Sequence, residues 1–182
     1  MALRSRSSRN RSHIVHFETL PFTRTANGKT VQRLRKCSLR FKKALANGDT
    51  DEQTVLSRDA WTTMHDLTLL IRKSEDNGAA TQGIMPNNTG WIAENLSLAD
   101  QQSMMSRKKV NRRHQKATRC PLRKCLNKLA HQTAATFRVD GRGSHYLVLT
   151  GPDQSSSKGP WVCEFNINTL ATHCANVIRQ FP

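Results

Sequence analysis

Eighteen residues near the middle of the chain, 107–124, carry nine positive charges and no negative one. No Asp or Glu occurs between Asp100 and Asp140. Like charges this dense repel one another, so either a polyanion or a well-solvated, disordered state must offset them. We expect nucleic acid to be the polyanion, RNA before DNA. The expected contacts in this segment are Arg107, Lys108, Lys109, Arg112, Arg113, Lys116, Arg119, Arg123 and Lys124.

Charge is distributed in blocks along the 182 residues. Residues 1–48 carry a net charge of +11, residues 49–100 carry −6, residues 101–139 carry +11, and residues 140–182 are neutral. Two basic regions therefore flank an acidic one. The basic blocks are expected to bind the ligand, and the neutral C-terminal region is expected to fold and self-associate, which predicts a homo-oligomer.

Composition limits the class of protein. Apolar residues make up 36% of the chain, so we expect a small core with extended basic segments. The five cysteines are scattered, and without a secretory signal they favour a reducing compartment over a secreted disulfide framework. No apolar run approaches the ~20 residues that a membrane-spanning helix needs. We expect a virion, or the host cytoplasm or nucleus, for a viral protein, and a mitochondrion as the alternative.

Residues 1–28 are expected to be a flexible basic arm. The first thirteen residues hold four Arg and four Ser, too few apolar groups to fold alone. An arm that neutralises phosphate is one interpretation; a mitochondrial presequence and a solubilising tail are the others. As an arm, its contacts with nucleic acid are Arg4, Arg6, Arg9 and Arg11.

Residues 29–77 are expected to form a helical pair, a basic helix followed by an acidic one. Asn27-Gly28 marks a turn before the first helix, which runs from Lys29 to Ala46. At roughly 100° per residue, one face is apolar: Val31, Leu34, Cys37, Phe41 and Leu45. The opposite face is expected to contact phosphates: Lys29, Arg33, Lys36, Arg40 and Lys43. The second helix, about Glu52 to Ser74, carries acids that we expect to pair with the first when no RNA is bound. Its apolar stripe is expected to belong to the core: Leu56, Ala60, Met64, Leu67, Leu70 and Ile71.

The next two segments differ in composition. Residues 78–96 are rich in Gly and Asn, which predicts a linker with one aromatic residue, Trp91. Ser97 followed by Asp100 forms a capping box, so a basic helix is expected over 97–119. This helix is polar all round in its second half and needs a partner to be stable.

Residues 120–182 are expected to form an α-β-β-β-α module, which makes the whole chain α+β. Leu122, Cys125, Leu126 and Leu129 repeat at helical spacing after Pro121. The period then changes to two on either side of the turn 140–143, which predicts a hairpin. A third strand is expected at 161–165 and a last helix at about 168–180.

This order of elements resembles the double-stranded RNA-binding domain over about a third of the chain. In that family a basic cluster opens the last helix and contacts phosphates across the major groove. The matching stretch here, 168–173, contains no Lys or Arg. The order is also similar to that of dimerising nucleocapsid domains of RNA viruses, in which a basic N-terminal arm precedes the folded part.

A zinc site is the main alternative chemistry. His114, Cys120, Cys125 and His131 fall within eighteen residues and offer four thiolate or imidazole ligands, although no CxxC pair occurs among them. Neither a carboxylate pair nor a phosphate-binding glycine loop stands in a promising context. We therefore predict no enzyme activity and no cofactor.

The sequence predicts an RNA-binding protein that packages or sequesters RNA, of the viral nucleocapsid, coat or silencing-suppressor type. Aromatic residues are scarce in the basic blocks, so the binding is expected to follow the backbone with little sequence preference and a steep salt dependence. A mitochondrial ribosomal protein with a presequence and a zinc-dependent nucleic-acid-binding regulator are the alternatives.

Overall fold

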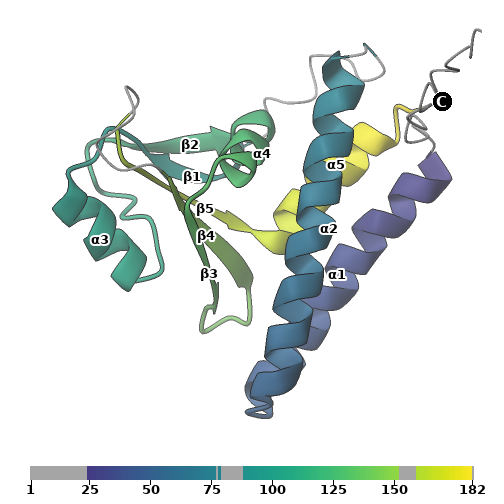
Figure 1. The fold of residues 1–182 in the computed structure, drawn as a ribbon, viewed down its shortest axis with the longest axis horizontal. Helices are drawn as coiled ribbons and strands as arrows, with labels where there is room; N and C mark the ends of the chain where they lie inside the picture. Colours follow the sequence, from purple (N-terminus) through teal and green to yellow (C-terminus); the bar gives the residue numbers. More distant parts are fainter. Residues whose placement is uncertain (1–23, 77, 79–87, 152–158, 182) are drawn as a thin grey trace, which may run out of the picture.

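The computed structural model describes residues 24–76, 78, 88–151 and 159–181 (Figure 1). The helices in them are α1 (Arg24–Ala46), α2 (Thr50–Asp76), α3 (Leu98–Ser106), α4 (Leu122–Ala130) and α5 (Ile167–Ile178). The strands are β1 (Asn88–Ala93), β2 (Ala117–Pro121), β3 (Ala134–Val139), β4 (His145–Gly151) and β5 (Trp161–Asn166). The fold is α+β, as the sequence predicts.

All five strands form one antiparallel sheet in the order β2-β1-β5-β4-β3. β1 and β5 are distant in the sequence but pair near the middle of the sheet, where Trp91 lies opposite Glu164 and Ile92 opposite Cys163. Gly90 permits this pairing, because a Cβ added there would lie 2.2 Å from the carbonyl oxygen of Glu164.

Helices cover one face of the sheet. α4 and α5 lie against the strands, and the α1–α2 hairpin packs on α4 and α5 (Figure 1). Ile92, Leu147 and Phe165 point from the strands into this main core. The apolar stripe predicted for the second helix is buried in full: Leu56, Ala60, Met64, Leu67, Leu70 and Ile71.

The other face is covered in part by α3 and the loop that follows it. A second, smaller apolar cluster joins them to the sheet: Ala93, Leu96, Met104, Val110, Val148 and Val162. Side chains alternate along the strands, so Cys163 faces the main core while Val162 and Glu164 face the α3 side. The sheet thus separates two environments, one apolar and one that carries polar side chains.

The basic helix is confirmed, with two corrections at its ends. α1 begins at Arg24, so the turn expected at Asn27-Gly28 is wrong; Asn27 is buried inside the helix. α1 packs against α5, and such tertiary packing overrides a local turn preference. Leu45 is 43% exposed and Ala44 takes its place in the core, against Leu56.

The linker expected over 78–96 is corrected by β1, which occupies residues 88–93 and pairs on both sides. The Gly and Asn residues that suggested a linker include Gly90, whose missing side chain the strand pairing requires. In the sequence, a glycine that a strand requires cannot be told from a glycine in a turn, because the strand that pairs with it is not known.

The basic helix expected over 97–119 is also corrected. The capping box is present, since the Ser97 hydroxyl accepts from the Asp100 N–H at 3.1 Å, but α3 ends at Ser106. Lys108 then adopts a left-handed conformation, with φ of 50°. Residues 117–121 form β2 because β1 offers them a pairing edge. Repulsion among successive basic residues disfavours a continued helix, and strand pairing satisfies the backbone instead.

The α-β-β-β-α order predicted for the C-terminal region is confirmed by α4, β3, β4, β5 and α5. This region is not a separate module, because β1 and β2 extend its sheet and the α1–α2 hairpin completes its core. The strand expected at 14–17 and the basic arm at 1–28 lie outside the described residues, apart from the start of α1. Among the helices that are described, none is both long and apolar enough to span a membrane.

Candidate nucleic-acid interface

The loop between α3 and β2 displays its charges on the open side of the sheet. Residues 107–116 hold most of the basic cluster, and β2 adds Arg119. Seven side chains, each exposed, define what we call the basic loop surface: Arg107, Lys108, Lys109, Arg112, Arg113, Lys116 and Arg119. The sequence grouped them in one basic segment, but predicted a helix there and not a loop held against a sheet.

Glu164 anchors this loop to β5. Its carboxylate is 1% exposed and accepts the Val110 N–H at 2.8 Å. Arg112 approaches the same carboxylate at 3.4 Å, and Arg138 of β3 also pairs with it. A buried carboxylate is tolerated only when charges and donors surround it, and these three groups supply them. The middle of the loop is therefore fixed, while its other basic residues are exposed.

Four of the basic side chains converge on one cavity of about 320 Å³, which Arg107, Lys109, Arg112 and Arg113 help to line. Asp100 is the one carboxylate among the described residues that line this cavity. It accepts from the Ser97 hydroxyl, which lowers its pKa, and lies 3.7 Å from His114. The cavity therefore has an excess of positive charge and donors that suits a phosphate group.

Trp91 of β1 lies beneath two arginines of this surface. The guanidinium of Arg119 is 4.3 Å from the centre of its ring system and that of Arg112 is 5.4 Å away. Such cation–π contacts hold an arginine in place while leaving its N–H groups free to donate. The sequence placed Trp91 in a linker; the short apolar run 91–93 was the available signal, hidden by the surrounding Gly and Asn residues.

The basic face of α1 forms a second surface. Lys29, Arg33, Lys36, Arg40 and Lys43 are all exposed, and four of them line a groove of about 640 Å³. Arg33 pairs with Asp59 at 3.4 Å and Arg40 with Glu52 at 2.8 Å. The predicted pairing between the two helices is thus confirmed. α1 and α3 lie at opposite ends of the molecule, so the two basic surfaces are well separated (Figure 1).

Arg123 and Lys124 lie away from the basic loop surface. Both belong to α4, on the helical side of the sheet. Arg123 pairs with Glu75 at 2.7 Å and with Asp76 at 3.6 Å, and Lys124 pairs with Glu94. The remaining expected contacts, Arg4, Arg6, Arg9 and Arg11, lie outside the described residues.

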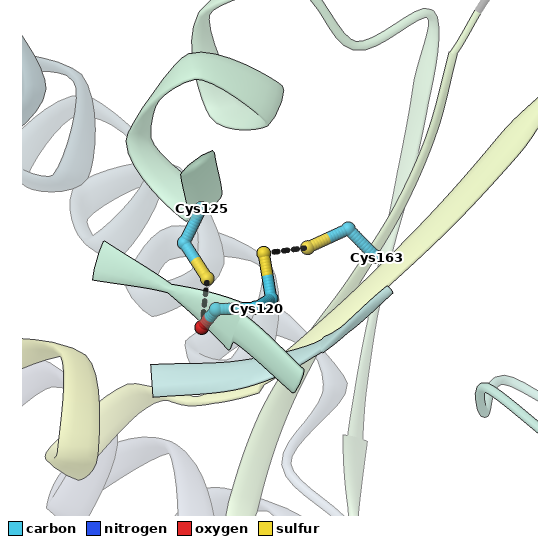
Figure 2. Close-up of side chains that lie close together, drawn as sticks. All are labelled: Cys120, Cys125 and Cys163. Carbon is cyan, nitrogen blue, oxygen red and sulfur yellow. Dashed lines mark hydrogen bonds between the residues drawn. The ribbon is translucent and has the colours of Figure 1, made fainter. Parts of the chain in front are cut away.

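The four residues considered for zinc are not brought together. His114 pairs with Asp100 on the α3 side, and His131 is exposed after the end of α4. Cys120 and Cys125 point into the main core, where Cys163 joins them (Figure 2). Successive residues of β2 face opposite sides of the sheet, so Cys120 points into the main core while Arg119 points to the α3 side. The spacing of the residues along the sequence did not reveal this. All five cysteines are free and buried.

The chain matches no protein-family model, no curated protein and no solved structure in the comparisons made with them. Its function therefore has to be inferred from its residues and their arrangement.

Proposed function

We propose that this chain binds RNA through the basic loop surface, with little sequence preference, and packages or sequesters it. The observation that carries the proposal is the convergence of Arg107, Lys109, Arg112 and Arg113 on one cavity with a single lining carboxylate. Arginine presents several N–H donors in a planar fork that matches phosphate oxygens. We propose binding and not catalysis at this surface.

The anchored loop favours binding to a backbone. Glu164 and Trp91 hold the loop and two arginines of the basic loop surface before any ligand arrives, which lowers the ordering cost of binding. Among the described residues, those that line the cavity include no Trp, Tyr or Phe on which a base could stack. Contacts to phosphates carry no sequence information, so the affinity is expected to be general and salt-dependent.

Two basic surfaces at opposite ends of the molecule favour packaging. One molecule would contact two RNA segments, through the basic loop surface and through the basic face of α1. Arg33 and Arg40 would exchange their exposed partners Asp59 and Glu52 for phosphates, at small cost because exposed ion pairs are weak. We propose that the protein acts as nucleocapsid, coat or silencing-suppressor proteins of RNA viruses do, with self-association through its C-terminal region.

The test is the affinity of the full chain for random-sequence single-stranded RNA and for duplex RNA, with three matched variants. One is Arg107→Gln/Lys109→Gln/Arg113→Gln, and one is Lys29→Gln/Lys36→Gln/Lys43→Gln. The control, Lys73→Gln/Arg142→Gln/Arg179→Gln, removes the same three charges from other exposed positions. Loss of three phosphate contacts at ~0.7 counterions each weakens binding about 50-fold near 0.15 M salt.

Light scattering on the same samples distinguishes packaging of RNA from sequestration of RNA. Growth into large particles supports packaging, and a small complex of fixed size on duplex RNA supports sequestration. Equal losses in the loop variant and the control would contradict the proposed surface. Weak binding of the unmodified chain to both RNAs would overturn the proposal.

A further inference from the structure

Three cysteines from three elements bring their sulfur atoms together in the main core. Cys120 lies in β2, Cys125 in α4 and Cys163 in β5, and all three are fully buried. Their Sγ atoms lie within 4.8 Å of one another, and those of Cys120 and Cys163 are 3.8 Å apart (Figure 2). This convergence joins residues that are forty-three positions apart in the chain.

The fold builds this cluster around β1. Cys120 lies opposite Gly90 on one side of β1, and Cys163 lies opposite Ile92 on the other. Gly90 has no side chain to separate the two neighbouring strands on this face. The strand-to-helix turn at Pro121 then places the first turn of α4 over β2, where the Cys125 thiol donates to the Cys120 carbonyl at 3.6 Å.

Burial alone does not account for the cluster. Cys37 and Cys174 are buried in the same core, but neither belongs to the group of converging sulfurs. Sulfur atoms that share one metal ion lie roughly 3.8–4.0 Å apart, because metal–thiolate bonds are about 2.3 Å long. The separation of Cys120 from Cys163 has this value.

We propose that Cys120, Cys125 and Cys163 bind a thiophilic metal ion in a three-sulfur site, and that this ion is monovalent copper. Structural zinc sites use four ligands, whereas the described residues gather only three here. Soft thiolates favour Cu(I) among the common ions.

The ion would fasten the edge of the sheet beneath the basic loop surface. Cys120 is the neighbour of Arg119, whose side chain points to the opposite face and stacks on Trp91. Metal bonds from β2 to β5 and α4 would hold this edge strand against opening. Because the site is closed, metal exchange would require β2 to open or the chain to fold around the ion.

The test uses the full reduced chain under anaerobic conditions, with Cu(I) supplied from a colorimetric chelator. One equivalent should move to the protein, and X-ray absorption should show three sulfur neighbours. Uptake should fall at least tenfold in Cys125→Ala and Cys163→Ala but not in Cys174→Ala, a buried cysteine outside the cluster. The X-ray absorption spectrum of the unmodified chain decides the ligands even if a variant fails to fold.

Uptake below a tenth of an equivalent, or copper bound by nitrogen and oxygen ligands, would overturn the site. Zinc that binds at one equivalent and resists exchange for Cu(I) would overturn the assignment to copper. None of these readouts involves RNA, so the result is independent of the proposed RNA binding.

Discussion

The carboxylate of Glu164 in β5 accepts the backbone N–H of Val110 at 2.8 Å, which ties the middle of the basic loop to the centre of the sheet. The Val110 side chain is fully buried beside this bond. One short contact therefore fixes the point from which the exposed basic residues spread on either side. The same carboxylate forms ion pairs with Arg112 and Arg138, so a single acidic residue organises both the loop and part of the sheet surface.

Replacing Glu164 by Gln should lower the free energy of unfolding by about 3 kcal/mol, because it leaves two arginines without their buried counter-charge. Chemical denaturation of both proteins measures the difference. Glu52→Gln is the matched control: it breaks the exposed pair with Arg40 and should cost less than about 1 kcal/mol. Equal losses would show that the buried carboxylate has no special role.

Replacing Gly90 by Ala should destabilise the fold by about 3 kcal/mol, since core overpacking costs this much when the neighbours cannot move aside. The new Cβ would lie 2.2 Å from the Glu164 carbonyl oxygen, which is backbone and has no other rotamer. Thermal unfolding is the measurement. Gly141→Ala, in the hairpin turn, meets nothing within 4 Å and should change stability by less than ~0.5 kcal/mol. A Gly90→Ala protein as stable as this control would contradict the β1–β5 pairing.

Stability should fall as the pH drops from about 6.5 to 4, in part because of His145. Burial lowers the pKa of this histidine to about 4, and its ring stacks on Phe41 with Nδ1 3.2 Å from the Ser38 hydroxyl. The unfolded chain binds the proton more readily, so protonation favours unfolding throughout this window, by about 3 kcal/mol in total. Denaturant titrations of the unmodified chain and of His145→Gln at several pH values measure the contribution of His145 to this pH dependence. The control variant His131→Gln should retain the contribution of His145.

RNA affinity should depend steeply on salt, and the loop variant should reduce that dependence. In a plot of log affinity against log salt concentration, removal of Arg107, Lys109 and Arg113 should make the negative slope shallower by about 2, at ~0.7 per lost phosphate contact. Fluorescence anisotropy across salt concentrations measures both slopes. If the affinity falls but the slope does not change, the three residues act on folding and not on phosphates.

α1, α2, α4 and α5 could be predicted largely from the sequence, because each carries a periodic apolar stripe. α2 buries the six residues that the pattern selects, and α1 differs only at its ends. The hairpin of β3 and β4 was also predictable, since the turn and the change to a period of two are local signals. These elements follow from residues within a few positions of one another.

The candidate sites were predicted only in part. The sequence supplied the charge of the basic loop surface, but not Trp91 and Glu164, which hold it in place. It grouped Cys120 and Cys125, but with two histidines in place of Cys163. In each case the missing residue reaches the site through strand pairing, and pairing joins residues that have no fixed separation along the chain.

Local periodicity and charge determined the α+β class, the two basic regions and the order of the C-terminal elements. The tertiary structure alone decided that residues 88–93 form a strand, that the basic segment is a loop and a sheet edge, and which cysteines meet. The physical reason is that a helix satisfies its hydrogen bonds within the segment, whereas a strand depends on a partner chosen from the rest of the chain. β1 has that partner on both sides, and the rest of the site is built around it.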